Sequence, residues 1–227
     1  MAHHDAQTTS TSDASRTIAN PAPLGLLTLA LTTALVGASF ARFLIPSMRV
    51  GLGTVVAPVL MYGGVVQVLA GMWAFRKNQP LLATLFSAYG GFLIALGALF
   101  LPLFGLVTLF GADPLALNHT MGLLFFCWAV SLGVLVLGAL RTSVAMTLVV
   151  ACLCLSYLLL AIGEFANANG SLLAIGGWIG IIGALMAWYT ALGGILQATH
   201  SSFQLPMGER GGALPAFGHP YGGEPAV

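Results

Sequence analysis

The chain has 227 residues, of which 58% are hydrophobic and only 6% are charged, and its net charge is +1. A soluble domain carries about 25% charged residues, so this composition excludes a soluble protein. The small net charge also gives no basic surface for nucleic acid. The 29 glycines are typical of membrane helices, because small residues let helix backbones approach closely. The composition therefore predicts an integral protein of a lipid bilayer.

Six long apolar segments follow a polar start. Residues 1–19 are rich in Ser and Thr, which indicates a disordered N-terminal tail. The apolar segments cover about residues 24–45, 54–75, 81–104, 121–140, 144–165 and 172–198. Each is long enough to cross a hydrocarbon core of about 30 Å as a helix. Residues 201–227 form a Gly- and Pro-rich C-terminal tail, also expected to be disordered. We expect an all-α membrane domain of six transmembrane helices over residues 20–200.

The basic residues predict how this domain is oriented. Lys and Arg gather on the cytoplasmic side of membrane proteins. Six crossings place five basic residues on the side of the N-terminus (Arg16, Arg76, Lys77, Arg141 and Arg210) and two on the other side (Arg42 and Arg49). We therefore expect both termini in the cytoplasm and the chain in the inner, or plasma, membrane.

Ionisable residues are nearly absent from the six segments. Glu164 is the single carboxylate near one of them, at the external end of the fifth. It is either an interfacial residue or part of a proton relay, and its position favours the first. Cys127, Cys152 and Cys154 have no metal-ligand spacing with His or a carboxylate and are expected to pack as small apolar residues. No nucleophile has a base beside it. We expect no enzyme, no metal and no cofactor.

The polar groups that remain inside the segments are neutral. They are Gln67, Ser87, Tyr89, Ser131, Ser156, Tyr157, Tyr189 and Thr190. Such groups either bond neighbouring helices together or line a pathway for a small, weakly hydrated solute. Pro58 is expected to kink the second helix. The glycines from Gly176 to Gly183 give the sixth helix a smooth face for another helix or another subunit. These features predict a channel or transporter for a small solute, which they do not name.

A constrained motif, "NPAPLGL", opens the first segment. Its residues are Asn20, Pro21, Ala22, Pro23, Leu24, Gly25 and Leu26. Asn20 fits an N-cap and Pro21 the first helical position, where its missing N–H is not needed. The free N–H groups of such a helix start favour anions. The motif therefore predicts either a carboxylate-friendly inner mouth or simply a rigid helix start.

Three motifs in order resemble the acetate uptake transporter family, the SatP/YaaH-type acetate–succinate permeases and their yeast acetate and ammonia-export relatives. They are "NPAPLGL", "GGVVQVLAGMWAF" with "FSAYGGF", and "LLLAIG" with "GGWIGIIGALMAWYTALGGILQ", and the similarity covers about residues 19–208. The resemblance implies transport of acetate and similar small monocarboxylates, with succinate and proton symport as further options. It also implies a hexameric ring with one narrow pathway per subunit.

By position, the resemblance assigns an apolar constriction to Leu29, Tyr89 and Leu153. We expect the Tyr89 hydroxyl to be its one hydrogen-bond donor. Ala187 matches a position associated with substrate size in the family. Asn20, Gln67 and Ser87 are further candidates for the pathway.

The chain departs from the family at Ala74 and Gly194, where acidic residues are usual, and at Leu93, where Trp is usual. These changes leave open a non-transporting sensor or scaffold of the same fold, or a channel for ammonia or another small neutral solute.

Overall fold

The computed structural model describes residues 18–42, 55–101 and 113–208. Its elements are helices: α2 (Ala22–Ala41), η1 (Val59–Val66), α4 (Gln67–Arg76), α5 (Pro80–Leu99), α7 (Pro114–Ala139), α8 (Val144–Phe165) and α9 (Gly170–Ala198). With η1 and α4 joined in one span, Val55–Arg76, the described part holds six helices long and apolar enough to cross a membrane. The prediction of an all-α, six-helix membrane domain is confirmed. Most of the N-terminal tail, the last residues of the first and third predicted segments, and Arg16, Arg49 and Arg210 lie outside the described residues.

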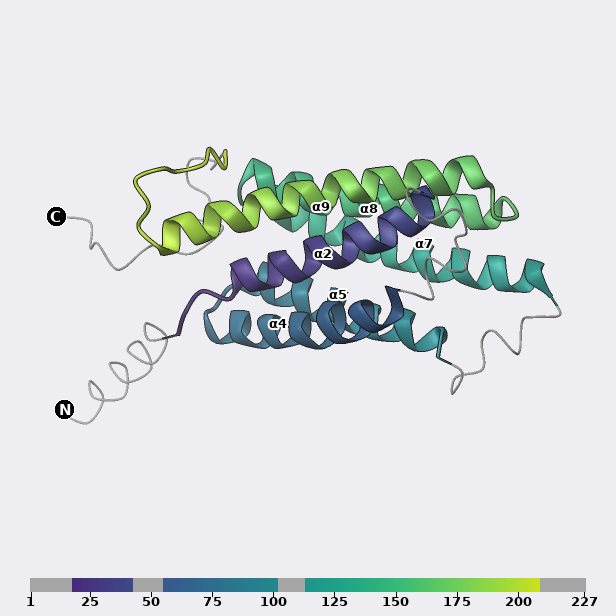
Figure 1. Ribbon diagram of the computed structural model, residues 1–227, viewed down its shortest axis with the longest axis horizontal. Helices are drawn as coiled ribbons and strands as arrows, with labels where there is room; N and C mark the ends of the chain where they lie inside the picture. Colours follow the sequence, from purple (N-terminus) through teal and green to yellow (C-terminus); the bar gives the residue numbers. More distant parts are fainter. Residues whose placement is uncertain (1–17, 43–54, 102–112, 209–227) are drawn as a thin grey trace.

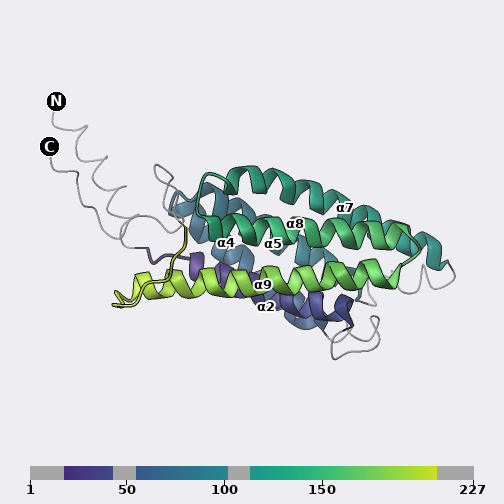
Figure 2. The same cartoon turned by 90° about the horizontal axis from the view of Figure 1, so that it is seen from above.

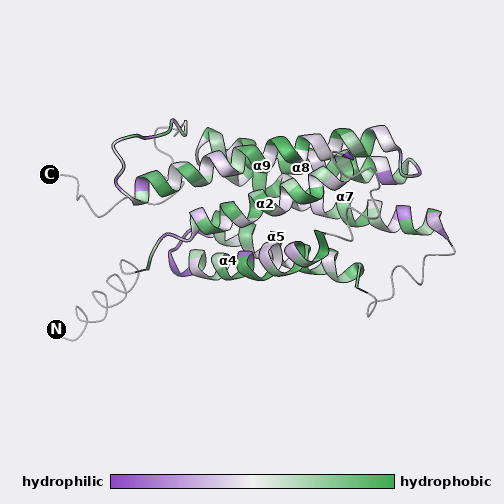
Figure 3. Cartoon of the chain, in the orientation of Figure 1, coloured by the Kyte–Doolittle hydropathy of each residue, from purple (hydrophilic) through white to green (hydrophobic). Residues whose placement is uncertain are grey.

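The six spans form a closed ring. α2 packs on α9, α9 on α8, α8 on α7, α7 on α5, α5 on η1 and α4, and these two return to α2. Figures 1 and 2 show that α2 begins and α9 ends at the same end of the bundle. The helices are apolar along their length, and hydrophilic residues gather toward their ends (Figure 3). Because the ring is closed, side chains from several helices point into its centre.

The fourth helix begins earlier than its hydropathy suggests. Hydropathy placed its start near Met121, whereas α7 begins at Pro114. The Asp113 carboxylate accepts hydrogen bonds from the amides of Leu115 and Ala116 at 3.1 and 3.0 Å, and proline suits the first turn of a helix. His119 therefore lies in the first turns of α7. A capped helix extends through polar residues that a hydropathy window does not recognise.

The sequence predicted a kink at Pro58. In the structure this residue is followed at once by the π-helical segment η1. Proline interrupts the regular backbone hydrogen bonding, and π-helical turns occur where that pattern is disturbed. Gly63 and Gly64 in η1 lie so close to α2 and α5 that added Cβ atoms would overlap Thr32 and Ile94. The two glycines thus let the second span pack closely against its neighbours.

The glycine-rich face of α9 packs against helices of its own chain. A Cβ on Gly177 would overlap the Ala41 amide and lie 2.5 Å from the Gly37 carbonyl oxygen of α2. Gly180 faces Ser156 of α8. Of the two partners that the sequence allowed for this face, the structure shows another helix of the same subunit.

Part of the C-terminal tail is packed against the bundle. The carbonyl oxygens of Gly208 and Met207 accept hydrogen bonds from the amides of Val144 and Ala145, at 3.0 and 3.2 Å. Met207 is buried, and the Tyr189 hydroxyl donates to the Pro206 carbonyl at 2.8 Å. These contacts satisfy amides at the start of α8 that have no partner within the helix. The expectation of disorder therefore does not hold for this short stretch, and residues 209–227 lie outside the described part.

Candidate functional site

Leu29, Tyr89 and Leu153 lie near the middle of α2, α5 and α8. All three side chains are fully buried in one apolar core. Their helices are the first, third and fifth spans, so they cross the membrane in the same direction. The three residues therefore occupy a similar depth inside the ring of helices.

The Tyr89 hydroxyl has two partners. It lies 2.9 Å from the Thr33 hydroxyl of α2 and 3.1 Å from the Tyr157 hydroxyl of α8. Thr33 and Tyr157 each follow a constriction residue, Leu29 and Leu153, by four positions. They share the same helix faces about 6 Å further along. The Tyr89 hydroxyl is thus the middle of a chain of three hydroxyls, and the expectation that it is the lone donor is wrong.

Sequence reasoning treated Tyr157 only as a polar group of the fifth helix and did not single out Thr33. The four-residue spacing from Leu29 and Leu153 is the signal that would have found both. It requires first knowing that α2, α5 and α8 face one another.

An aromatic layer holds the Tyr89 ring. Tyr89 stacks on Trp128 of α7, with ring centroids 5.8 Å apart, and meets Tyr157 edge-on at 6.3 Å. Trp128 in turn stacks on Phe92 at 4.5 Å. Such aromatic pairs stabilise the packing of a ring by about 0.5–1.5 kcal/mol beyond burial alone. They fix the Tyr89 side chain in the ring of helices.

Gln67 and Ser87 are buried polar groups that no hydrogen bond satisfies within the described part of the chain. Gln67 lies on α4 between Gly63, which touches α2 and α5, and Gly71, which faces Ser87 of α5. A buried amide without a partner is costly and calls for an explanation such as a passing solute or water. Both residues therefore remain candidates for the pathway.

The "NPAPLGL" motif uses most of its own amides. The Asn20 side-chain oxygen accepts from the Ala22 amide at 3.0 Å, the Gly25 amide donates to the Pro21 carbonyl at 3.0 Å, and Pro23 has no N–H. Pro21 is the N-cap, one position before the place expected for it. Of the amides in the first turn of α2, at most that of Leu24 is left to bind an anion. A Cβ at Gly25 would overlap the Phe86 ring, so the glycine serves close packing of α2 on α5.

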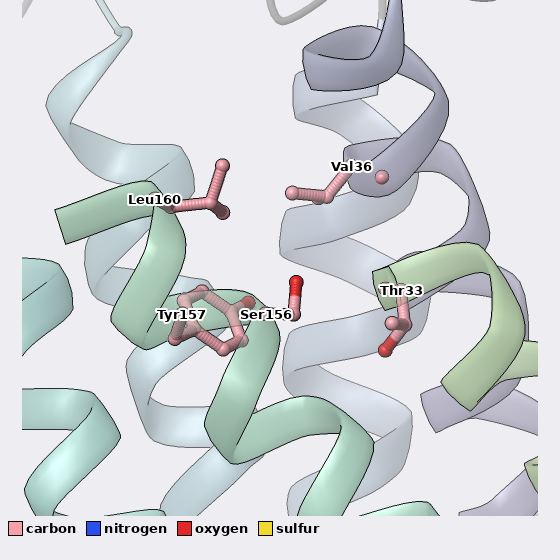
Figure 4. Close-up of a pocket in the computed structure, with 7 residues that line it drawn as sticks. Thr33, Val36, Ser156, Tyr157 and Leu160 are labelled. Atoms are coloured by element: carbon pink, nitrogen blue, oxygen red, sulfur yellow. The ribbon is translucent and has the colours of Figure 1, made fainter. Parts of the chain in front are cut away.

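A small cavity adjoins the hydroxyl chain. Thr33, Val36 and Gly37 of α2, Ser156, Tyr157 and Leu160 of α8, and Gly180 of α9 line it (Figure 4). Its volume of about 10 Å³ is room for about one water-sized group. It lies on the side of Leu29 and Leu153 away from the start of α2.

The remaining candidate positions are buried within the chain. Ala187 is fully buried on α9, and Ala74 is fully buried on α4. Glu164 lies in the last turn of α8, as expected of an interfacial residue, although only 4% of it is exposed. An acidic residue at position 74 would be a buried charge, and the alanine found there avoids that desolvation cost.

In the part of the chain that the structure describes, six apolar helices close into a ring whose centre carries no charged side chain, and this arrangement defines a multi-pass membrane protein. The family model described as "GPR1/FUN34/yaaH family" matches residues 3–209. The chain belongs to this family.

Several relatives are similar over most of this chain. Accumulation of dyads protein 2 of Saccharomyces cerevisiae is 34% identical, over 85% of this chain and 68% of its own length. Acetate permease A of Emericella nidulans is 32% identical, over 85% of this chain and 66% of its own. The succinate-acetate/proton symporter SatP of Escherichia coli is 32% identical, over 85% of this chain and 96% of its own.

A solved structure of the bacterial acetate channel SatP superposes with a TM-score of 0.73 at 31% identity. The match covers 84% of this chain and 99% of that one. The chain thus spans about two thirds of these two fungal relatives and nearly the whole of SatP.

Proposed function

We propose that this protein forms a membrane pathway for acetate and similar small monocarboxylates, with Leu29, Tyr89 and Leu153 as its narrowest point. The observation that carries the proposal is the buried layer at mid-depth of the helix ring, where Leu29, Tyr89 and Leu153 are fully buried in one apolar core. The SatP acetate channel, which shares the fold, and a relative named acetate permease support the choice of solute.

The physics of such a layer sets its selectivity. An ion stripped of water in an apolar ring has a large desolvation cost, and the residues named for this layer carry no charge. A dianion such as succinate should therefore pass less readily than acetate. Gln67, Ser87, Asn20 and Ala187 are proposed to line the approaches to this point.

Uptake of labelled acetate into proteoliposomes tests the function. We expect the reconstituted protein to raise initial uptake well above that of protein-free vesicles, and excess unlabelled acetate to compete. Measuring at about pH 5.5 and about pH 7.5 separates uptake that follows the protonated acid from uptake that follows the anion. Uptake equal to protein-free vesicles would favour a sensor or scaffold. Ammonia permeation without uptake of labelled acetate would favour a channel for ammonia.

We further propose a hexameric ring in the inner, or plasma, membrane, with both termini cytoplasmic. Among the residues that the structure describes, the basic residues Arg76, Lys77 and Arg141 lie at the end of the bundle where α2 begins. Their position supports this orientation. α7 supports the assembly, because it presents a broad apolar face, including Leu123, Val134 and Leu137, that other helices of the chain leave exposed. This face is available to lipid or to a neighbouring subunit.

The mass of the detergent-solubilised protein tests the assembly. We expect a micelle-corrected mass about six times that of the 23.4 kDa chain, measured by light scattering on a sizing column. The value should hold when the protein is diluted. A stable mass of one chain at all concentrations would contradict the ring.

A further inference from the structure

The three hydroxyls of Thr33, Tyr89 and Tyr157 carry three hydrogens for two contacts. The contact between the Thr33 and Tyr89 hydroxyls, at 2.9 Å, uses one hydrogen. The contact between the Tyr89 and Tyr157 hydroxyls, at 3.1 Å, uses another. Each hydroxyl donates once and accepts through two lone pairs. One hydrogen of the chain is therefore left without an acceptor among its own members.

The complete burial of Tyr89 limits which hydroxyl carries this hydrogen. If Tyr89 accepted from both neighbours, its own hydrogen would be stranded at a fully buried position, which is costly. If Tyr89 donates, the spare hydrogen belongs to Thr33 or to Tyr157. Both of these residues line the cavity between α2, α8 and α9, whereas Tyr89 does not (Figure 4). The spare donor thus belongs to a residue that lines the cavity.

Ser156 supplies the complementary group. Its hydroxyl donates to the Gly176 carbonyl of α9 at 2.7 Å, so its hydrogen is used and its oxygen lone pairs remain. Figure 4 shows this hydroxyl pointing into the space between the helices. The other lining side chains, Val36 and Leu160, are apolar, and the two glycines have none. The cavity thus offers one donor, one acceptor and no charge.

We propose that this cavity binds the neutral carboxyl group of a small acid. The carbonyl oxygen of the acid accepts from Thr33 or Tyr157, and its O–H donates to the Ser156 oxygen. An ionised carboxylate fits poorly, because its second oxygen would face the Ser156 lone pairs with no cation nearby. The inference rests on the proposed function and adds the form of the solute, the protonated acid, and the residues that recognise it.

The size of the cavity sets how the acid enters. A space of about 10 Å³ holds one oxygen-sized group, so a whole carboxyl group requires Leu160 to change rotamer. Leu160 is not branched at Cβ, whereas Val36 is β-branched and held in one χ1 rotamer by its helix. The carboxyl group therefore needs only side-chain movement to be seated.

Acetamide is the probe that tests this inference. It has the shape of acetic acid and remains neutral at every relevant pH, with one carbonyl acceptor and an N–H donor. We expect it to bind the detergent-solubilised wild-type protein at neutral pH, measured by saturation-transfer NMR titration. We also expect unlabelled acetic acid, added at low pH, to displace it.

Two variants remove the proposed contacts separately. Thr33→Val with Tyr157→Phe removes both donors at the cavity, and Ser156→Ala removes the acceptor. Loss of one hydrogen bond should raise the dissociation constant of acetamide about fivefold in each. Matched controls remove the same kinds of hydroxyl away from the cavity, on α9. They are Thr190→Val and Tyr189→Phe. The Thr190 hydroxyl donates to the Met186 carbonyl, and the Tyr189 hydroxyl donates to the Pro206 carbonyl. Both should bind acetamide as wild type does.

The outcomes separate the inference from the proposed function. Equal acetamide binding by wild type, cavity variants and controls would overturn the inference, as would no acetamide binding by wild type. Acetate uptake by the wild type would leave the proposed function standing in either case. If the double variant does not fold, as judged by its thermal unfolding, Ser156→Ala still decides the matter.

Discussion

Replacing Leu153 with alanine should raise the rate of lactate uptake relative to acetate about tenfold or more, because one methylene in a tight apolar site changes discrimination by that much. The change removes bulk from the proposed narrowest point and leaves the neighbouring Tyr157 hydroxyl in place. Leu29→Ala should act in the same direction from the opposite helix. Initial uptake of acetate, lactate and succinate, matched for membrane expression, measures the effect.

Two substitutions of Tyr89 test whether this residue belongs to the narrowest point of the pathway. Tyr89→Ala should let solutes leak, because it removes the ring that stacks on Trp128 as well as the hydroxyl. Tyr89→Phe keeps the ring but breaks both contacts of the hydroxyl chain, so acetate uptake should fall while size selectivity is kept.

Leu173→Ala is the control for the leucine variants. Leu173 is an equally buried leucine of α9 that packs against Gly163, and its loss should lower stability but not change the order of solutes. Each leucine variant is expected to lose about 2–5 kcal/mol of stability, so uptake is compared only among folded proteins. If all variants keep wild-type rates and the wild-type order of solutes, the pathway does not run between these residues.

Gly177→Ala should destabilise the protein strongly although alanine is the better helix former. The added Cβ would overlap backbone atoms of α2 at Ala41 and Gly37, which cannot move aside as a flexible side chain can. Overpacking of this kind costs about 1–3 kcal/mol. Thermal unfolding in detergent should show a clearly lower Tm than wild type.

Gly91→Ala is the matched control. A Cβ at Gly91 of α5 would meet no atom within 4 Å, so the substitution should leave the Tm unchanged or raise it, since alanine is favoured over glycine in a helix by about 1 kcal/mol. Equal Tm values for the two variants would show that α2 and α9 do not pack as closely as described.

The sequence by itself determined that this is a six-helix membrane protein. Length and hydropathy are local properties, and a backbone in lipid must satisfy its hydrogen bonds within each segment. The fifth helix was predicted with its bounds, Val144–Phe165. The start of α7 at Pro114 was missed, because the Asp113 cap extends the helix beyond its apolar part. Membership of the family was also readable from motifs contiguous in the chain.

The partners of the buried groups were decided only by the tertiary structure. No local pattern tells that the Tyr89 hydroxyl meets Thr33 and Tyr157, 56 and 68 positions away. The glycine face of α9 suited a helix or a subunit equally well, until the close approach of Gly177 to Gly37 showed the first. Met207 and Gly208 looked like tail, because their carbonyl oxygens accept from amides at the start of α8, which is distant in the sequence. In each case the stabilising contact is made with a residue distant in the sequence. Which residue that is depends on how the ring of helices closes rather than on the local sequence.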